Sequence, residues 1–350
     1  MMGQRHGERI VKVFVYEYTC CQSLTEETAT ASLRAEGWAM LSAILSDLAG
    51  VDGVTVETML AEDHARIPFA AWRVGPRDEE RVFRDLAARA EYTFVIAPEF
   101  NDLLYHRCRW VEECSGRMLG PGSELVLLTG DKLALARHLG SSGVPTPTTY
   151  PLAEVLTGTA CVSFPAVCKP RQGAGSLSTY LLQGLDDLRT LQRDEPSTAF
   201  IVQPFVSGAP ASVGFLFGPH RCLALPPAAQ RLSGDGRFRY LGGHVPLPPV
   251  LAERAQRVAQ SAVEPLPALR GYIGVDVVLG AALDGSADQV IEINPRLTTS
   301  YVGLRSLART NLAEVMLSLA AGEAPSELCW HQKSVTWNAD GTIVPGVVET

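Results

Sequence analysis

The chain of 350 residues is long enough for two or three domains and a large core. Hydrophobic residues make up 46% of it and charged residues 19%, which is ordinary for a globular enzyme, and the formal net charge is −8. Because no basic run occurs, we expect no nucleic-acid partner. No apolar run reaches membrane-spanning length and residues 1–9 are polar, so we expect no membrane partner and a cytoplasmic location.

Cysteine and histidine usage points to a reducing compartment without a structural zinc site. The eight cysteines and seven histidines are scattered along the chain. No CxxC pair occurs, and no histidine spacing suits zinc. We therefore expect reduced thiols, several of them acting as small hydrophobes in strands.

The N-terminal third predicts a small parallel sheet. Strands and helices alternate there: strands at 11–18, 54–60 and 92–97, and helices from a Ser23–Glu26 capping box to Gly50 and at 79–89. This rhythm is typical of one Rossmann-like half-domain. From Gly116 to Gly130 the composition turns to glycine and loop-formers, which predicts a domain boundary near residue 118.

The rest of the chain is predicted to be mostly antiparallel. Its predicted strands are 164–169, 177–182, 200–204, 211–217, 221–225, 237–245, 271–279 and 290–294, and its predicted helices are 131–139, 186–193, 249–262 and 301–321. A polar tail follows from Gln332. The expected division is an N-terminal α/β domain at 1–118, a central subdomain at 119–205 and a C-terminal subdomain at 206–350.

A carboxylate and an amide are predicted to lie side by side at a strand end. In the strand 290–294, Glu292 and Asn294 share one face because side chains two apart point the same way. Ile291 and Ile293 then face the core. Such oxygens suit a hard cation such as Mg²⁺. The alternative is a polar strand face followed by a surface arginine, Arg296.

A second acid, Asp276, supports the metal interpretation. It interrupts the apolar strand 271–279, and buried carboxylates are rare unless they are paired or bind a metal. A turn at Asp284 joins the two strands into an antiparallel hairpin. Asp276 and Glu292 are each eight residues from Asp284, so they can face each other. We predict that Asp276, Glu292 and Asn294 hold one or two Mg²⁺ ions, which Mn²⁺ can replace.

Three further segments have the composition of a nucleotide site. Lys169 stands at a strand end before the glycine loop Gly173 to Ser176, where backbone N–H groups can approach phosphate; a tight hairpin turn is the alternative. Lys132 opens a helix, where a cation opposes the helix dipole, so a bound anion would account for it; a solvated lysine is the alternative. Gln203 to Val206 forms an apolar hinge that could border a planar base, or a plain connection.

Taken in chain order from about Gly120 to Ala321, these motifs resemble the ATP-grasp superfamily. The resemblance implies an α/β (α+β) fold: two ATP-grasp subdomains preceded by a small Rossmann-like domain. It also implies roles for the residues. Lys132, Lys169, Gly173, Ala174, Gly175 and Ser176 would bind ATP phosphates; Gln203, Pro204, Phe205 and Val206 would contact adenine; Asp276, Glu292 and Asn294 would bind Mg²⁺; Arg296 and Lys169 would act on the transferring phosphoryl group.

The segment Glu292 to Arg305 is most similar to tyramine–glutamate ligases of methanofuran biosynthesis. The segments Ala97–Glu99 and Pro210–Ser212, together with Gln230, are similar to that group as well. The likeness implies ATP-dependent ligation, through an acyl phosphate, of the γ-carboxylate of L-glutamate to tyramine or tyrosine. The pathway would be that of methanofuran or methylofuran. It also implies small-molecule partners, with a homodimer as a candidate assembly.

Two points stay open from the sequence. Thr298, Thr299, Ser300 and Tyr301 can hydrogen-bond glutamate or the acyl phosphate, or they can simply cap the last helix. The function can also be that of another ATP-grasp amino-acid or dipeptide ligase, or of a nucleotide-binding regulatory module. The intact set of acids and Arg296 disfavours the regulatory module, which has little need of a full metal site.

Overall fold

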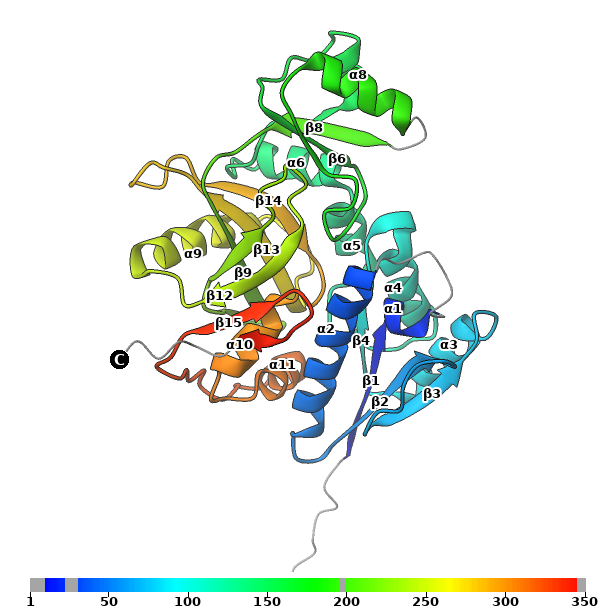
Figure 1. Ribbon diagram of the computed structural model, residues 1–350. Helices are drawn as coiled ribbons and strands as arrows, with labels where there is room; N and C mark the ends of the chain where they lie inside the picture. The colour runs from blue at the N-terminus through cyan, green and yellow to red at the C-terminus, as the bar shows by residue number, and fades with distance from the viewer. Residues whose placement is uncertain (1–9, 23–30, 196–198, 345–350) are drawn as a thin grey trace, which may run out of the picture.

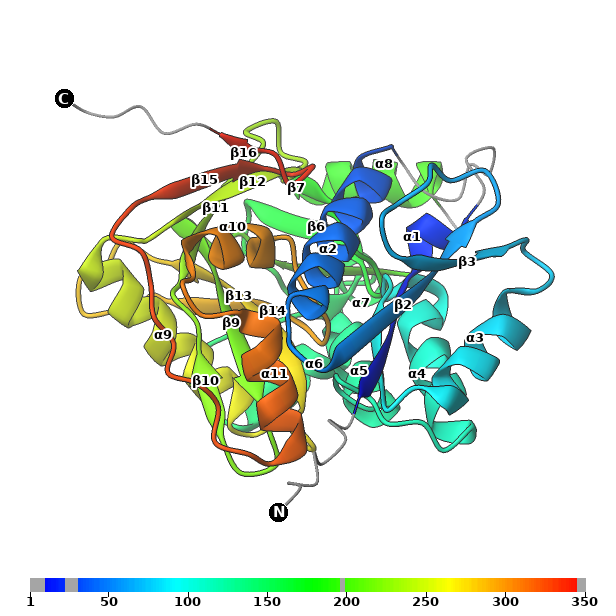
Figure 2. The ribbon, with the colours of Figure 1, turned by 90° about the horizontal axis from the view of Figure 1, so that it is seen from below.

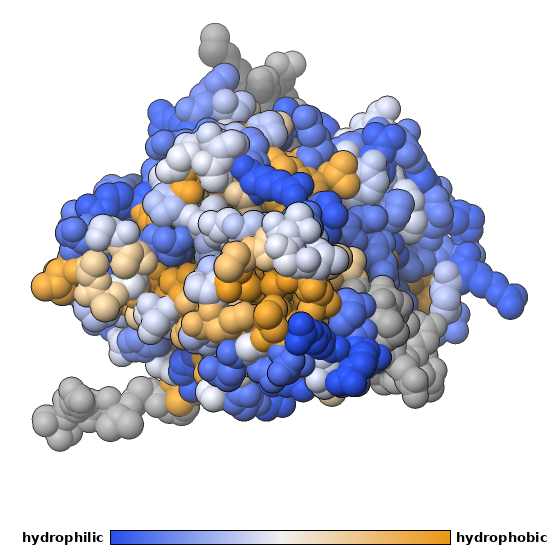
Figure 3. Space-filling model, turned by 90° about the horizontal axis from the view of Figure 1, so that it is seen from above, coloured by the Kyte–Doolittle hydropathy of each residue, from blue (hydrophilic) through white to orange (hydrophobic). Residues whose placement is uncertain are grey.

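Three sheets organise the part of the chain that the computed structural model describes, residues 10–22, 31–195 and 199–344 (Figure 1). An N-terminal parallel sheet packs beside a large C-terminal sheet, and a smaller antiparallel sheet lies above both (Figure 1). Seen from above, hydrophobic residues gather in the middle of the face and hydrophilic ones frame them (Figure 3). Folded proteins always leave part of their apolar surface exposed.

The N-terminal sheet confirms the predicted parallel α/β unit. Its strands are all parallel in the order β3-β2-β1-β4, with β1 at Val11–Glu17, β2 at Val54–Ala61, β3 at Ala70–Val74 and β4 at Tyr92–Ile96. Around it lie α1 (Tyr18–Cys21), α2 (Ala31–Ala49), α3 (Glu79–Arg89), the 3₁₀ turn η1 (Phe100–Asp102) and α4 (Leu103–Glu113). The edge strand β3 was not predicted, because most of its residues are exposed and show no apolar alternation.

Helix α2 buries the face that its sequence predicted. Gly37, Leu41, Ile44, Leu45 and Leu48 are all buried, whereas Leu33 is only partly so. The predicted capping box at Ser23 and Glu26 lies outside the described residues. The helix lies between the parallel sheet and the C-terminal helices α10 (Ser300–Leu307) and α11 (Leu312–Ala321) (Figure 2).

The segment from Gly116 to Gly130, whose loop-forming composition suggested a domain boundary, contains the helix α5 (Ser123–Gly130) in its second half. Its start is held by Glu112, whose carboxylate accepts hydrogen bonds from the Ser123 backbone at 2.8 Å and hydroxyl at 2.7 Å. Leu125 and Val126 are buried, so tertiary packing stabilises a segment whose glycines suggested a loop. The next helix, α6 (Lys132–Ser141), begins where it was predicted.

The small antiparallel sheet contains the predicted lysine strand and hinge strand. Its order is β5-β8-β6-β7, with β5 at Tyr150–Pro151, β6 at Ala166–Pro170, β7 at Tyr180–Leu182 and β8 at Phe200–Pro204. Helices α7 (Leu152–Leu156) and α8 (Leu185–Asp194) pack with it. The predicted strand 177–182 begins only at Tyr180, because Ser176 and Ser178 have positive φ angles that a strand excludes.

The large sheet is built mainly from antiparallel neighbours. Its order is β14-β13-β9-β11-β12-β15-β16 with β10 beside β9, and the strands are β9 (Ala209–Phe217), β10 (Cys222–Ala224), β11 (Ala228–Leu232), β12 (Tyr240–Val245), β13 (Gly271–Leu279), β14 (Gln289–Asn294), β15 (Val335–Asn338) and β16 (Ile343–Val344). Helix α9 (Pro249–Val263) covers β13 and β9.

Two predictions about the C-terminal region are wrong. The single helix predicted at 301–321 is broken into α10 and α11, because Ala308 is extended and the Asn311 side chain caps α11 by accepting from the Ala313 and Glu314 backbone. The tail predicted as polar contains β15, and its Trp337 is fully buried against Gly243 and Gly303.

The space around Trp337 gives a prediction for stability. A methyl group at Gly303 would lie 2.2 Å from the Trp337 ring, so Gly303→Ala should destabilise the fold by about 1–3 kcal/mol through overpacking. Thermal unfolding followed by circular dichroism measures the change. Gly140→Ala is the matched control, because nothing lies within 4 Å of its added Cβ in α6. An unchanged melting temperature in G303A would contradict the packing described.

Candidate active site

A cleft of about 250 Å³ gathers nearly all the residues that the sequence singled out. It is lined by Lys132, Lys169, Gly173, Ala174, Gly175, Ser176, Gln203, Pro204, Phe205, Val206, Asp276, Glu292, Asn294, Arg296, Thr298, Thr299 and Ser300. These side chains come from the three segments that have the composition of a nucleotide site and from the hairpin of β13 and β14, which are distant in sequence. The predicted site is therefore one continuous cleft.

The hairpin places its two acids opposite each other, as predicted. Asp276 of β13 pairs in register with Glu292 of β14, across the turn at Asp284. The Asn294 amide nitrogen donates to Asp276 at 3.1 Å, which leaves the amide oxygen for another partner. The Gln230 amide of β11 donates to the other Asp276 oxygen at 2.8 Å. Both carboxylate oxygens of Asp276 are thus oriented by amide donors.

The predicted inward position of Ile291 is wrong. Ile291 is only partly buried and lines the cleft, whereas Val290 and Ile293 enter the core. The register shifts between Asp276 and Val277, so Val277 stands opposite Val290. Such a bulge breaks the strict two-residue alternation on which the prediction rested.

The two acids titrate differently because their neighbours differ. Burial, followed by repulsion from Glu292, raises the pKa of Asp276 to about 6. Burial also acts to raise the pKa of Glu292, but attraction from Lys132 and Lys169 outweighs it, and the net pKa is lowered. Glu292 is therefore ionised at neutral pH.

Lys132 is a buried lysine with two partners, so its interpretation as a solvated surface residue is wrong. Its ammonium group lies 2.8 Å from a Glu292 oxygen and donates to the Gly173 carbonyl at 2.8 Å. Asp131 caps α6 by accepting from the Leu133 and Ala134 backbone. The helix cap thus fixes Lys132 between the hairpin of β13 and β14 and the glycine loop.

Lys169 is buried at the end of β6, where burial and the nearby charge of Lys132 lower its pKa to about 8. Glu292 and Asp276 act in the opposite direction and keep part of its charge. The glycine loop follows directly, with Gly175 at a φ of +65°. A phosphate placed between this loop and the two lysines would meet backbone N–H groups and a cationic wall.

The hinge segment forms the apolar wall of the same cleft. Gln203 is buried at the end of β8, and Phe205 stacks on Phe238 with ring centroids 5.9 Å apart. A planar base would find aromatic and aliphatic surface there. Its contact with adenine stays a prediction.

Arg296 is partly buried and paired with an acid from the N-terminal domain. Its Nε and Nη2 donate to the two oxygens of Glu99 at 2.8 and 3.1 Å, and its Nη1 donates to the Leu297 carbonyl at 3.3 Å. A guanidinium has five N–H donors, so two remain for a phosphoryl group in the cleft. No pattern in the sequence indicates this pairing, because Glu99 and Arg296 are far apart in the chain.

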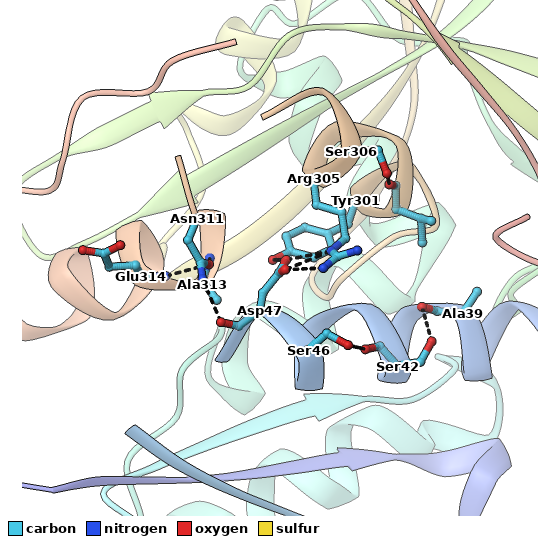
Figure 4. Close-up of polar contacts among 11 residues, drawn as sticks. Ala39, Ser42, Ser46, Asp47, Tyr301, Arg305, Ser306, Asn311, Ala313 and Glu314 are labelled. Carbon is cyan, nitrogen blue, oxygen red and sulfur yellow. Dashed lines mark hydrogen bonds and ion pairs between the residues drawn. The ribbon is translucent and has the colours of Figure 1, made fainter. Parts of the chain in front are cut away.

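The four polar residues after Arg296 divide into two groups. Thr298, Thr299 and Ser300 line the cleft, and the Tyr272 hydroxyl lies 2.9 Å from that of Thr298 and 3.2 Å from that of Ser300. The Tyr301 side chain is fully buried outside the cleft lining, and its hydroxyl donates to Asp47 of α2 at 2.6 Å (Figure 4). Tyr301 therefore joins two helices.

The donor set suits Mg²⁺ bound together with phosphates. Within the described residues, no three His, Cys, Asp or Glu side chains form a metal-binding group. Asp276, Glu292 and the Asn294 amide oxygen supply fewer ligands than a closed protein cage would need. Mg²⁺ commonly uses one or two carboxylates and takes its other ligands from nucleotide phosphates and water. The residues thus fit the ion if a nucleotide accompanies it.

Comparison with known proteins matches this geometry to a family. Residues 129–300 match the model of the ATP-grasp domain, and residues 54–126 match that of the pre ATP-grasp 3 domain. An ATP-grasp superfamily structure from Archaeoglobus fulgidus has a TM-score of 0.71 at 23% identity, covering 94% of this chain and 92% of that one. An N5-carboxyaminoimidazole synthetase from Staphylococcus aureus, complexed with ADP, has a TM-score of 0.72 at 12% identity, covering 94% and 82%.

The chain belongs to the ATP-grasp superfamily and is a carbon–nitrogen ligase that uses ATP. It is related to the tyramine–L-glutamate ligases. That of Methanocaldococcus fervens is 26% identical over 321 residues, which are 89% of this chain and 94% of the relative. That of Methanocaldococcus jannaschii is 28% identical over 233 residues, which are 67% of this chain and 64% of the relative.

No helix in the described ranges has the length and apolar character to cross a membrane.

The lowered pKa of Lys169 predicts a pH dependence of nucleotide binding. The ammonium group is charged below its pKa of about 8, so affinity for MgATP should be highest there. Well above pH 8 the affinity should fall by about tenfold per pH unit, because the free protein must take up a proton to bind phosphate. Calorimetric titration between pH 7 and about 10 measures the slope. Lys169→Arg keeps its charge throughout and should flatten it; equal slopes in both proteins would contradict the assignment.

Proposed function

We propose that the chain joins the γ-carboxylate of L-glutamate to tyramine or tyrosine at the expense of ATP, in methanofuran or methylofuran biosynthesis. The single observation that carries this proposal is the likeness to tyramine–L-glutamate ligase over 94% of that relative's length. The cleft supports it, because the acids, lysines and arginine of the motif converge on one cavity. The glutamate and amine subsites remain proposals at this identity.

The chemistry proceeds in two displacements. An oxygen of the glutamate γ-carboxylate attacks the γ-phosphorus of ATP; a P–O bond forms, the bond to the β-phosphate oxygen breaks, and ADP leaves. The ammonium group of the acceptor first loses a proton; the neutral amine nitrogen then attacks the acyl carbon, the carbon–oxygen bond to phosphate breaks, and the nitrogen loses a second proton. The products are a γ-glutamyl amide, ADP and phosphate. Neither step needs a nucleophile from the protein, and electrostatic stabilisation of the phosphoryl group is the main requirement.

The cleft's own residues supply that stabilisation. Lys132 and Lys169 lie beside the glycine loop, where they can neutralise phosphate charge. The two unused N–H donors of Arg296 can hold the transferring group while Glu99 fixes the guanidinium plane. Asp276, Glu292 and Asn294 would hold Mg²⁺, which neutralises phosphate charge when bound. Lys132 can exchange its contact with Glu292 for one with a phosphate oxygen.

Replacing Glu292, the acid whose pKa is lowered, tests the metal assignment. Glu292→Gln should keep the fold and lower turnover by about a hundredfold or more, because phosphoryl-transfer electrostatics are lost. ADP release in a coupled assay measures the rate. Glu80→Gln is the control, since Glu80 lies exposed on α3 and, among the described residues, pairs with Arg84 of the same helix. Near-normal turnover in E292Q would remove Glu292 from the metal site.

Product analysis tests the reaction itself. Incubation with ATP, Mg²⁺, L-glutamate and tyramine or tyrosine should give a γ-glutamyl amide with equimolar ADP, identified by mass spectrometry. A panel of other acids and amines serves as the control. ADP release with other pairs but never with glutamate and an aromatic amine would refute the substrates and leave the ligase. Release of AMP would refute the acyl-phosphate mechanism.

A further inference from the structure

One end of the cleft is formed by the N-terminal domain. Of the described residues that line the cleft, the N-terminal domain contributes two, Glu36 and Met40 of α2. They are four positions apart, so they lie on the same face of the helix. This end therefore combines a carboxylate with an apolar thioether side chain, and the sequence motifs predicted neither.

Glu36 is a partly buried carboxylate next to groups that a substrate would touch. Burial raises its pKa, and its charge acts on both Arg296 and the Tyr240 hydroxyl. Among the described residues, Ser32 hydrogen-bonds to Glu36: its hydroxyl donates at 3.2 Å from the preceding turn of α2. Tyr240 and Thr299 line the cleft with it. A cation entering this end could replace the weak contact with Ser32 at little cost.

Helix α2 holds Glu36 in a fixed position. At the far end of the helix, Asp47 accepts from Tyr301 at 2.6 Å and from the Nε of Arg305 at 2.9 Å, and its carbonyl accepts from Asn311 at 2.8 Å (Figure 4). Near Glu36, a Cβ at Gly37 would lie 2.4 Å from the Thr19 hydroxyl, so the helix packs tightly there as well. A residue on such a rigid element can select a ligand by geometry.

Each cation of the cleft already lies near a carboxylate. Among the described lining residues the cations are Lys132, Lys169 and Arg296. Lys132 pairs with Glu292, Arg296 pairs with Glu99, and Lys169 lies within the field of Glu292 and Asp276. An ammonium group at Glu36 would find a carboxylate partner. A carboxylate next to that ammonium group on the same substrate would lie close to the Glu36 carboxylate, and like charges held close together repel each other.

We infer that Glu36 binds the ammonium group of the acyl acceptor, so that this end of the cleft selects aromatic monoamines over amino acids. Met40 and Tyr240 supply the apolar surface for the aromatic body. The inference rests on the proposed function for the identity of the reaction. The inference goes beyond the proposed function in two ways: it assigns the acceptor to the tyramine class rather than the tyrosine class, and it names Glu36 as the residue that determines this specificity.

Direct binding tests this assignment without turnover. Tyramine and tyrosine are titrated calorimetrically into the full-length protein loaded with MgADP. The wild type should bind tyramine at least about tenfold more tightly than tyrosine. Tyramine makes a charge-assisted contact with Glu36, and the carboxylate of tyrosine opposes that contact by repelling Glu36. Glu36→Gln should weaken tyramine binding by roughly tenfold to a hundredfold and leave MgADP affinity within about twofold. Glu80→Gln should match the wild type.

Each other outcome has a defined meaning. The inference is overturned if the wild type does not bind tyramine, if it binds tyrosine as tightly as tyramine, if E36Q binds tyramine as the wild type does, or if E36Q loses affinity for glutamate instead. Glu36→Asp keeps the charge and should recover part of the tyramine affinity, which a merely structural role would not produce. If no amine yields a γ-glutamyl amide while tyramine binding still depends on Glu36, the proposed function fails and the amine site stands.

Discussion

The buried contact between Arg296 and Glu99 is the constraint on which the geometry of the cleft depends. Their side chains are nearly inaccessible and distant in sequence. They form a bidentate salt bridge that joins the end of β14 to the end of β4. Removing either partner would leave an uncompensated buried charge, at a cost of about 3–5 kcal/mol. The pair therefore fixes the N-terminal domain against the hairpin of β13 and β14, and the same guanidinium lines the cleft.

A second contact orients the opposite wall. Asp47 of α2 accepts from Tyr301 and Arg305 of α10, which begins at Ser300, the last of the three polar residues that line the cleft (Figure 4). Helix α2 is thus fixed to the C-terminal subdomain at one end, and Glu36 and Met40 from its earlier turns border the cleft. The N-terminal domain, which lacks the phosphate-binding motifs, therefore forms part of the cleft wall.

The sequence predicted what depends on local pattern and failed where distant contacts decide. Alternation and the turn at Asp284 were sufficient to place Asp276 opposite Glu292, because hairpin register follows from chain distance. The bulge that turned Ile291 into the cleft left no such signal. Trp337, read as part of a polar tail, is buried because β15 adds to a sheet formed by residues far earlier in the chain. The position of Glu36 in the cleft and the pairing of Glu99 with Arg296 left no local signal for the same reason: only the fold brings these distant segments together.

The charges of the cleft show why its parts belong together. Its described lining holds three cations, Lys132, Lys169 and Arg296, and three carboxylates, Glu36, Asp276 and Glu292. Burial raises the pKa of Asp276 to about 6 and lowers that of Lys169 to about 8, so the ligand-free cleft disfavours the charged form of each group relative to water. Phosphates and a divalent cation arriving together would favour the charged form of both groups, because each new charge lies beside one of opposite sign. Binding of either alone would leave one of them without a partner, so nucleotide and metal are expected to bind this cleft cooperatively.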